Sequence, residues 1–302
     1  MTADRPFLGI LLMLGFCILA PFGDAIAKYL GDTVPLGQLL FARYFLQVVI
    51  LLPIVFFTHR TLMMTGRVFR LTCLRTVLHI VAVGAMFESY RYLPLADAIA
   101  IAFVMPFIML LLGKVFLSEE VGPYRLAACA VGFLGTLLVI QPNFAAVGTP
   151  ALLPLAVAVL FALFMFVTRQ IAKEIDPVSL QASNGVVGTV LIAAIMWMLA
   201  DSGLDSSEII IPTNKDLALL TALGILGTVA HLLMTWSLRF APSASLAPMQ
   251  YLEIPVATII GWLVFRDLPN ALAALGIVIT IGAGLYVIYR EQLNAKRQTV
   301  RV

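Results

Sequence analysis

Long apolar runs separated by short polar turns follow one another along the whole chain. A run of about 20 apolar residues is long enough to cross the roughly 30 Å hydrocarbon core of a bilayer as a helix. The pattern therefore predicts ten transmembrane helices, near residues 7–29, 35–57, 71–92, 96–117, 122–140, 150–171, 178–200, 217–239, 243–265 and 270–289.

Composition agrees with an all-α integral membrane protein, because 62% of the 302 residues are hydrophobic and only 12% are charged. The connections between the runs are too short to hold a soluble domain. The chain has no GxxxxGK[ST] phosphate loop and no HExxH zinc motif, so we expect neither an enzyme nor a bound metal or cofactor. Ala25-Ile26-Ala27 resembles a signal-peptide cleavage site, but the run is too long for one and is retained as the first helix.

The basic residues divide unequally between the two predicted faces of the membrane. If the N-terminus is cytoplasmic, fourteen cations fall on the cytoplasmic face and four on the other. This bias supports ten helices in a bacterial inner membrane, with both termini in the cytoplasm. The cytoplasmic set is Arg5, Arg60, Arg67, Arg70, Arg75, Lys114, Arg125, Arg169, Lys173, Arg239, Arg290, Lys296, Arg297 and Arg301, and the other set is Lys28, Arg91, Lys215 and Arg266.

The turn YRYLPLAD at residues 90–97 has an echo, LRFAPSAS, at residues 238–245. The same separation of 148 residues relates other positions, which predicts a tandem repeat with units 1–148 and 149–302. Five helices per unit is an odd number, so the second unit enters the membrane from the opposite side, an arrangement typical of secondary transporters. The matched positions include Glu119 with Asp267, and Ala128, Gly132 and Thr136 with Gly276, Thr280 and Gly284.

In order and spacing, these features resemble the EamA-type members of the drug/metabolite transporter superfamily, and most of all the YddG-type amino-acid exporters of bacteria. The resemblance implies a carrier with a central cavity between helices 1–4 and 6–9, with helices 5 and 10 packed to the side. The motifs that carry it are Ala27-Lys28, Arg43, the proline turns, the midhelix prolines Pro106 and Pro255, and the acidic ends Glu119-Glu120 and Asp267.

Four ionisable residues within the predicted spans are candidates for a substrate site: Arg43, His79, His231 and Glu253. An ionisable group at the bilayer centre costs at least about 2.5 to 3.5 kcal/mol unless it finds a partner. Arg43 and His79 lie about 12 Å into their helices and Glu253 about 15 Å, close to the midplane. Each of the four can instead be structural, holding helices together, and for Arg43 this interpretation is favoured.

Two helical stripes extend the candidate site. His79, Met86 and Tyr90 share one face of the third helix, and His231 and Thr235 share a face of the eighth, with Trp236 beside them. Such stripes are usually ordinary packing, but methionine adapts to several ligand shapes. Pro106 and Pro255 each free a backbone carbonyl in midhelix.

These features predict a secondary transporter for amino acids, including aromatic ones, and related metabolites, acting as an exporter by alternating access. The alternative is an importer of a cofactor or S-adenosylmethionine-like metabolite. The expected partners are a small-molecule substrate and the lipid bilayer, with no nucleic acid and a monomer as the working assumption. Transport direction, coupling ion and oligomeric state stay open at this point.

Overall fold

The structure, a computed structural model, describes residues 5–118, 122–140, 148–200, 208–266 and 271–299, and these contain helices and no strand. In chain order the elements are α1 (Pro6–Leu30), α2 (Leu36–Phe57), α3 (Gly66–Ser89), α4 (Leu95–Ala102), α5 (Met105–Phe116), α6 (Pro123–Ile140), the short 3₁₀ helix η1 (Thr149–Ala151), α8 (Leu152–Ile171), α9 (Pro177–Met198), α10 (Asn214–Phe240), α11 (Ser243–Gln250), α12 (Glu253–Ile260), the π-helical turn η3 (Gly261–Phe265) and α13 (Ala271–Thr299).

Seven helical segments among the described residues are long and apolar enough to cross a membrane. The all-helical membrane fold predicted from the sequence is therefore confirmed, whereas ten crossings and an inverted repeat stay predictions. The seven segments are Pro6–Leu30, Leu36–Phe57, Gly66–Ser89, Ala98–Phe116, Leu152–Ile171, Pro177–Met198 and Asn214–Phe240.

Two runs expected to be single helices are broken near their middles. α4 ends at Ala102 and α5 begins at Met105, with Pro106 in its first turn. α11 ends at Gln250 and α12 begins at Glu253, with Pro255 in its first turn. A proline lacks the N–H that would continue the preceding helix but is accepted in the first turn of the next one. Both midhelix prolines thus mark helix breaks.

The turn that occurs twice in the sequence has the same structural role each time. Pro94 is the N-cap residue of α4, and Pro242 is the N-cap residue of α11. In both places the proline ends the chain reversal after a long helix, α3 or α10, and starts a broken one. The acidic residues Glu119, Glu120 and Asp267, which the sequence placed at the ends of the broken runs, lie outside the described residues.

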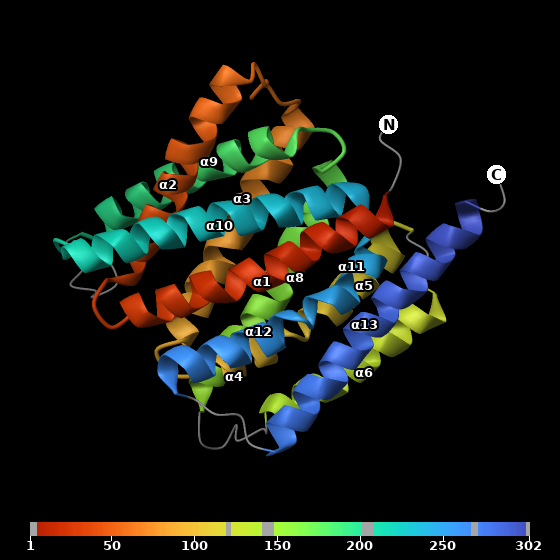
Figure 1. Cartoon of the computed structure of the whole chain (residues 1–302). Helices are drawn as coiled ribbons and strands as arrows, with labels where there is room; N and C mark the ends of the chain where they lie inside the picture. Colours follow the sequence, from red (N-terminus) through yellow and green to blue (C-terminus); the bar gives the residue numbers. More distant parts are fainter. Residues whose placement is uncertain (1–4, 119–121, 141–147, 201–207, 267–270, 300–302) are drawn as a thin grey trace.

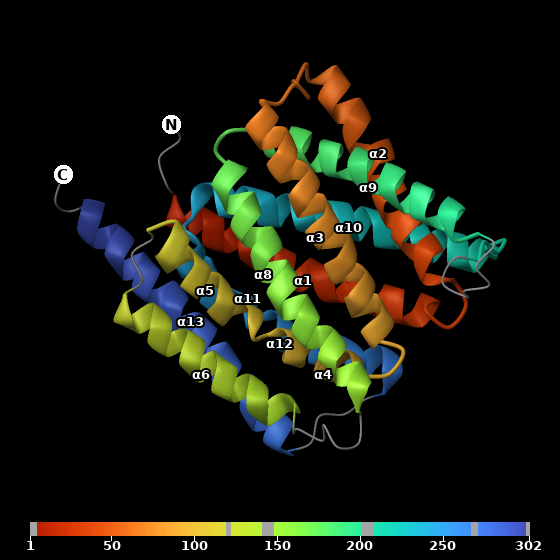
Figure 2. The same ribbon diagram turned by 180° about the vertical axis from the view of Figure 1, so that it is seen from behind.

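The helices form a bundle in which segments from the two halves of the sequence alternate (Figure 1). α1 and α10 lie side by side across the middle, and from behind α3 and α8 make a similar pair (Figure 2). α2 and α9 form one edge of the bundle, and α6 and α13 form the opposite edge. The broken segments α4–α5 and α11–α12 fill the space next to the α6–α13 edge. They separate this edge from the two central pairs, α1–α10 and α3–α8.

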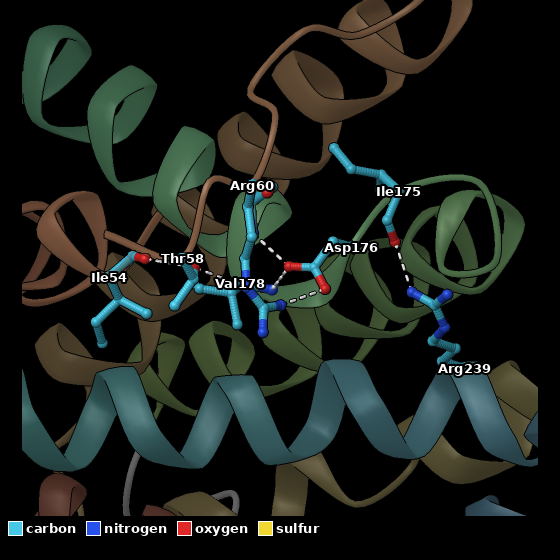
Figure 3. Close-up of polar contacts among 8 residues, drawn as sticks. Ile54, Thr58, Arg60, Ile175, Asp176, Val178 and Arg239 are labelled. Carbon is cyan, nitrogen blue, oxygen red and sulfur yellow. Dashed lines mark hydrogen bonds and ion pairs between the residues drawn. The ribbon is translucent and has the colours of Figure 1, made fainter. Parts of the chain in front are cut away.

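One end of the bundle, which we call the Arg60 end, is defined by the turns at residues 58–65 and 172–176 (Figure 3). Arg60 forms an ion pair of 2.5 Å with Asp176, and Arg67 forms a second with Glu174. The Asp176 carboxylate also caps α9, accepting hydrogen bonds from the backbone N–H groups of Val178 (3.0 Å) and Ser179 (3.1 Å). These contacts tie the first half of the chain to the second.

Replacing Asp176 with alanine is expected to lower the melting temperature in detergent, because losing an N-cap costs about 1 kcal/mol. Asp176→Asn is the matched control, since asparagine caps a helix as well as aspartate does but cannot pair with Arg60. An exposed ion pair contributes only about 0 to 1 kcal/mol, so the asparagine variant should melt closer to the parent. The melting temperature is measured by tryptophan fluorescence. If Asp176→Ala and Asp176→Asn melt at the same temperature, the cap contributes nothing to stability.

The opposite end, which we call the Lys28 end, is defined by the turns at residues 31–35 and 90–94. Lys28 donates hydrogen bonds to the backbone oxygens of Leu93 (2.7 Å) and Tyr90 (3.4 Å), at the C-terminus of α3. The Gln38 side chain exchanges two hydrogen bonds with the Ile210 backbone, of 2.9 and 3.1 Å. Contacts between residues far apart in the sequence thus join the helices at this end too.

Candidate functional site

A cavity of about 80 Å³ lies at the centre of the bundle. Both halves of the chain line it, because α1, α2, α3, α4 and α5 contribute from the first half and α8, α10 and α12 from the second. Most of the wall is apolar, with aromatic rings and two thioethers among its side chains. This group includes Phe16, Phe87, Phe103, Phe161, Met86 and Met105.

Four ionisable side chains interrupt the apolar wall: Asp24, Arg43, His231 and Glu253. Arg43, His231 and Glu253 are buried, with 6%, 6% and 8% of their surfaces exposed. The four ionisable side chains come from α1, α2, α10 and α12, so the fold brings together residues that are up to 229 positions apart in the sequence. A mainly apolar pocket with a few convergent polar groups is typical of a small-molecule site.

Arg43 and His231 form a direct contact across the cavity wall. The Nδ1 atom of His231 lies 3.0 Å from the backbone oxygen of Gly227 and 3.1 Å from Nη2 of Arg43, and its Nε2 atom lies 3.5 Å from the same Nη2. Since a carbonyl only accepts, Nδ1–H donates to Gly227, and Nε2 is the acceptor available to the guanidinium. A Cβ at Gly227 would lie 3.0 Å from Cζ of Arg43, so the missing side chain makes room for the guanidinium.

His79 lies behind this wall and is almost fully buried. Its Nδ1 atom is 2.8 Å from the Tyr44 hydroxyl, and its ring stacks on Phe164 with centroids 4.5 Å apart and an interplanar angle of 13°. The His231 ring is also 4.5 Å away. Among the described residues, Nε2 of His79 has no hydrogen-bond partner. His79 therefore connects α2, α3, α8 and α10 directly behind the cavity.

The other candidates from the sequence divide between the cavity and the packed interior. Met86 lines the cavity, and Tyr90 is buried at the end of α3, within electrostatic range of Asp24 and Glu253. Thr235 is buried and donates a 2.7 Å hydrogen bond to the backbone oxygen of His231. Trp236 packs instead against a cluster of Leu51, Val55, Val178 and Ala182, away from the cavity lining.

Sequence reasoning missed Asp24, which lies within an apolar helix where an acid is costly. This cost could have marked Asp24 as a functional candidate. The nearby Ala27-Lys28 pair, however, indicated a helix end, where a charged side chain is expected. No cluster of three or more histidine, cysteine, aspartate or glutamate residues suited to a metal occurs within the described ranges.

Arg75 was expected among the cytoplasmic cations and is instead fully buried. It donates hydrogen bonds to Thr168 (2.9 Å), Gln181 (3.3 Å) and Asn184 (3.5 Å), and its guanidinium lies over the Phe164 ring. The difference arises because α3 begins at Gly66, five residues before the predicted start, so Arg75 lies well inside the helix. Arg75 fixes α8 and α9 against α3 beside the cavity.

Comparison with known proteins shows what this architecture is similar to. The sequence pattern of the EamA-like transporter family matches residues 7–141 and again residues 149–290. A riboflavin transporter of Brucella anthropi is 28% identical over 258 residues, which is 85% of this chain and 89% of the relative. An S-adenosylmethionine uptake transporter of Rickettsia felis is 25% identical over 278 residues, or 91% of this chain and 90% of the relative.

A solved crystal structure has the same fold, with a TM-score of 0.73 at 17% identity, covering 92% of this chain and 94% of the other. These relatives are not named as amino-acid exporters, so they do not support the specific resemblance to YddG-type exporters. They agree better with the alternative, a transporter that takes up a cofactor or an S-adenosylmethionine-like metabolite.

Proposed function

Because the chain belongs to the EamA-like transporter family, we propose that it is a secondary transporter that imports a cofactor or S-adenosylmethionine-like metabolite across the bacterial inner membrane. The observation that carries this proposal is the central cavity, which is lined by both halves of the chain and combines aromatic walls with a few ionisable groups. Amino-acid export, the first interpretation of the sequence, has no support from the relatives.

We further propose that the chain has ten crossings in two inverted units, residues 1–148 and 149–302. Helix directions support this arrangement. α1 begins at the Arg60 end, where the N–H of Arg5 bonds the Phe240 oxygen (2.7 Å), whereas α8 finishes there, where Arg169 bonds the Leu238 oxygen (2.6 Å). The first helices of the two units thus run in opposite directions, and the two broken segments occupy equivalent places.

The cavity volume supports alternating access. Pockets that hold drug-sized ligands enclose about 300 to 1,000 Å³, several times the 80 Å³ found here. Contacts at the Arg60 and Lys28 ends also hold the two halves of the chain together at both ends of the bundle. Substrate entry therefore requires one end to open and the wall to widen, and the helix breaks at residues 103–104 and 251–252 are places where this motion can occur.

The orientation can be tested with single cysteines in a background that lacks Cys17, Cys73 and Cys129. Met63 at the Arg60 end and Ile211 near the Lys28 end are strongly exposed. Basic residues gather at the Arg60 end, so we expect this end in the cytoplasm. An impermeant maleimide should label Ile211→Cys in intact cells and Met63→Cys only after permeabilisation. Ala98→Cys, fully buried, is the control that should stay unlabelled in both. Labelling of both exposed sites from one side would contradict the inverted arrangement.

Transport is tested by counterflow in proteoliposomes that contain the purified protein. Liposomes loaded with unlabelled riboflavin, S-adenosylmethionine or an aromatic amino acid are diluted into the corresponding radiolabelled compound. We expect accumulation of labelled riboflavin or S-adenosylmethionine above protein-free liposomes, and none of the amino acid. Accumulation of the amino acid alone would overturn the proposal in favour of the exporter interpretation.

A further inference from the structure

The Glu253 carboxylate is buried in the cavity wall without a partner. It is 8% exposed, lines the cavity, and makes no hydrogen bond or ion pair with any residue in the described part of the chain. Its electrostatic neighbours are Asp24, Cys17 and Tyr90, of which none is a cation. Leaving a carboxylate unpaired in a membrane protein is costly, so a polar group in this position is a functional candidate.

The helix break explains how the carboxylate is tolerated there. Glu253 is the first residue of α12, and an acidic side chain in the first turn of a helix is stabilised by the helix dipole. In many transporters the N-terminus of a broken helix faces an anionic group of the substrate. Here the first turn of the helix carries an acidic side chain of the chain itself, which disfavours an additional anion at this helix N-terminus.

The charges that line the cavity do not balance. Asp24 and Glu253 are acidic, whereas Arg43 is the single lysine or arginine in the lining as the structure describes it. Asp24 has Arg43 within electrostatic range, whereas the charged group that acts on Glu253 is the acidic Asp24, so Glu253 has no positive partner among the described lining residues. The guanidinium of Arg43 also remains able to contact an anionic group, because its contacts here are with His231 and the Phe87 ring.

We propose that the cavity selects substrates with a net positive charge, binding a sulfonium or ammonium group between Glu253 and Asp24. A buried cation is stabilised by a carboxylate and by the faces of aromatic rings, and Phe16, Phe103 and Phe161 line the same space. Arg43 would receive a carboxylate of the substrate, where one is present. This inference rests on the proposed transport function and names the substrate class for its site.

The test compares two compounds that differ in charge and little in shape. S-adenosylmethionine carries a sulfonium, and S-adenosylhomocysteine is the thioether left when the sulfonium methyl is removed. In proteoliposomes the parent protein should take up the sulfonium compound with a KM lower than that of the thioether by on the order of tenfold or more, the usual difference for one charged contact. Equal KM values, or uptake of neutral riboflavin alone, would overturn the inference while leaving the transport function intact.

Glu253→Gln tests the residue itself. Removing its charge should raise the KM for S-adenosylmethionine on the order of 10- to 100-fold and leave that for the thioether nearly unchanged. Glu253→Asp keeps the charge and should retain the preference for the sulfonium compound if the glutamine variant fails to fold. Glu88→Gln is the control, because Glu88 pairs with Arg91 outside the cavity.

The outcomes distinguish a failure of charge selection from a failure of transport. If Glu253→Gln melts normally but raises the KM for the sulfonium compound and for the thioether by the same factor, Glu253 does not select charge. If the parent protein transports none of S-adenosylmethionine, S-adenosylhomocysteine and riboflavin, the proposed transport function is overturned, and the charge selectivity with it.

Discussion

Gly135→Leu is expected to cause a large loss of stability, because this glycine lies in the tight contact between α6 and α13. A Cβ at Gly135 would lie 2.6 Å from Oγ1 of Thr280 and 2.9 Å from the backbone oxygen of Gly276. Oγ1 of Thr280 already donates to that same oxygen over 2.8 Å, so neither atom can move away freely. Overpacking of this kind costs about 1 to 3 kcal/mol, which is several degrees of melting temperature for a chain of this size.

Gly282→Leu is the matched control on the other helix of the pair. No atom lies within 4 Å of the position that its Cβ would occupy, so the same added bulk should cost little. The measurement is the melting temperature in detergent, with counterflow in parallel. We expect the substrate preference of Gly135→Leu to be unchanged, since α6 and α13 do not line the cavity. An altered preference at normal stability would mean that this edge contributes to the transport pathway.

The sequence was informative about helix positions because the apolar runs are bounded by residues with definite backbone preferences. α1, α2 and α9 begin and end within two residues of the prediction, and Pro6, Pro35 or Pro177 stands at the start of each. The breaks after Ala102 and Gln250 were harder to place. Hydropathy is continuous through them, and a midhelix proline can kink a helix as well as break it.

The cavity was less predictable than the helices, because periodicity shows which residues share a face but not which neighbour that face meets. Thr235 and Trp236 are adjacent in sequence and therefore point about 100° apart on α10. Thr235 is buried beside His231, whereas Trp236 packs on α2 and α9. Asp24 and Glu253 come together only through the packing of α1 on α12, which no local pattern in the sequence encodes.

Arg43→Met is expected to lower both stability and transport, and a second substitution can separate the two effects. Removing the guanidinium leaves Asp24 and Glu253 without a cation in the described cavity lining, and breaking a buried charge contact typically costs about 3 to 5 kcal/mol. Adding Asp24→Asn removes one of the two carboxylates, so the double variant should recover much of the lost melting temperature. Such recovery is the coupling that a double-mutant cycle measures.

Transport in the double variant decides what Arg43 does. The reference is Asp24→Asn alone, because Asp24 is itself proposed to bind the substrate cation. If Arg43 only neutralises Asp24 and holds α2 against α10 through His231, the double variant should exchange substrate at the rate of Asp24→Asn. If Arg43 also binds an anionic group of the substrate, transport by the double variant should be at least about tenfold lower than transport by Asp24→Asn, despite the restored stability. We expect the second result, because Arg43 lines the cavity and its described contacts, with His231 and the Phe87 ring, leave it able to bind an anionic group. Equal transport rates in the double variant and in Asp24→Asn would instead assign Arg43 a purely structural role.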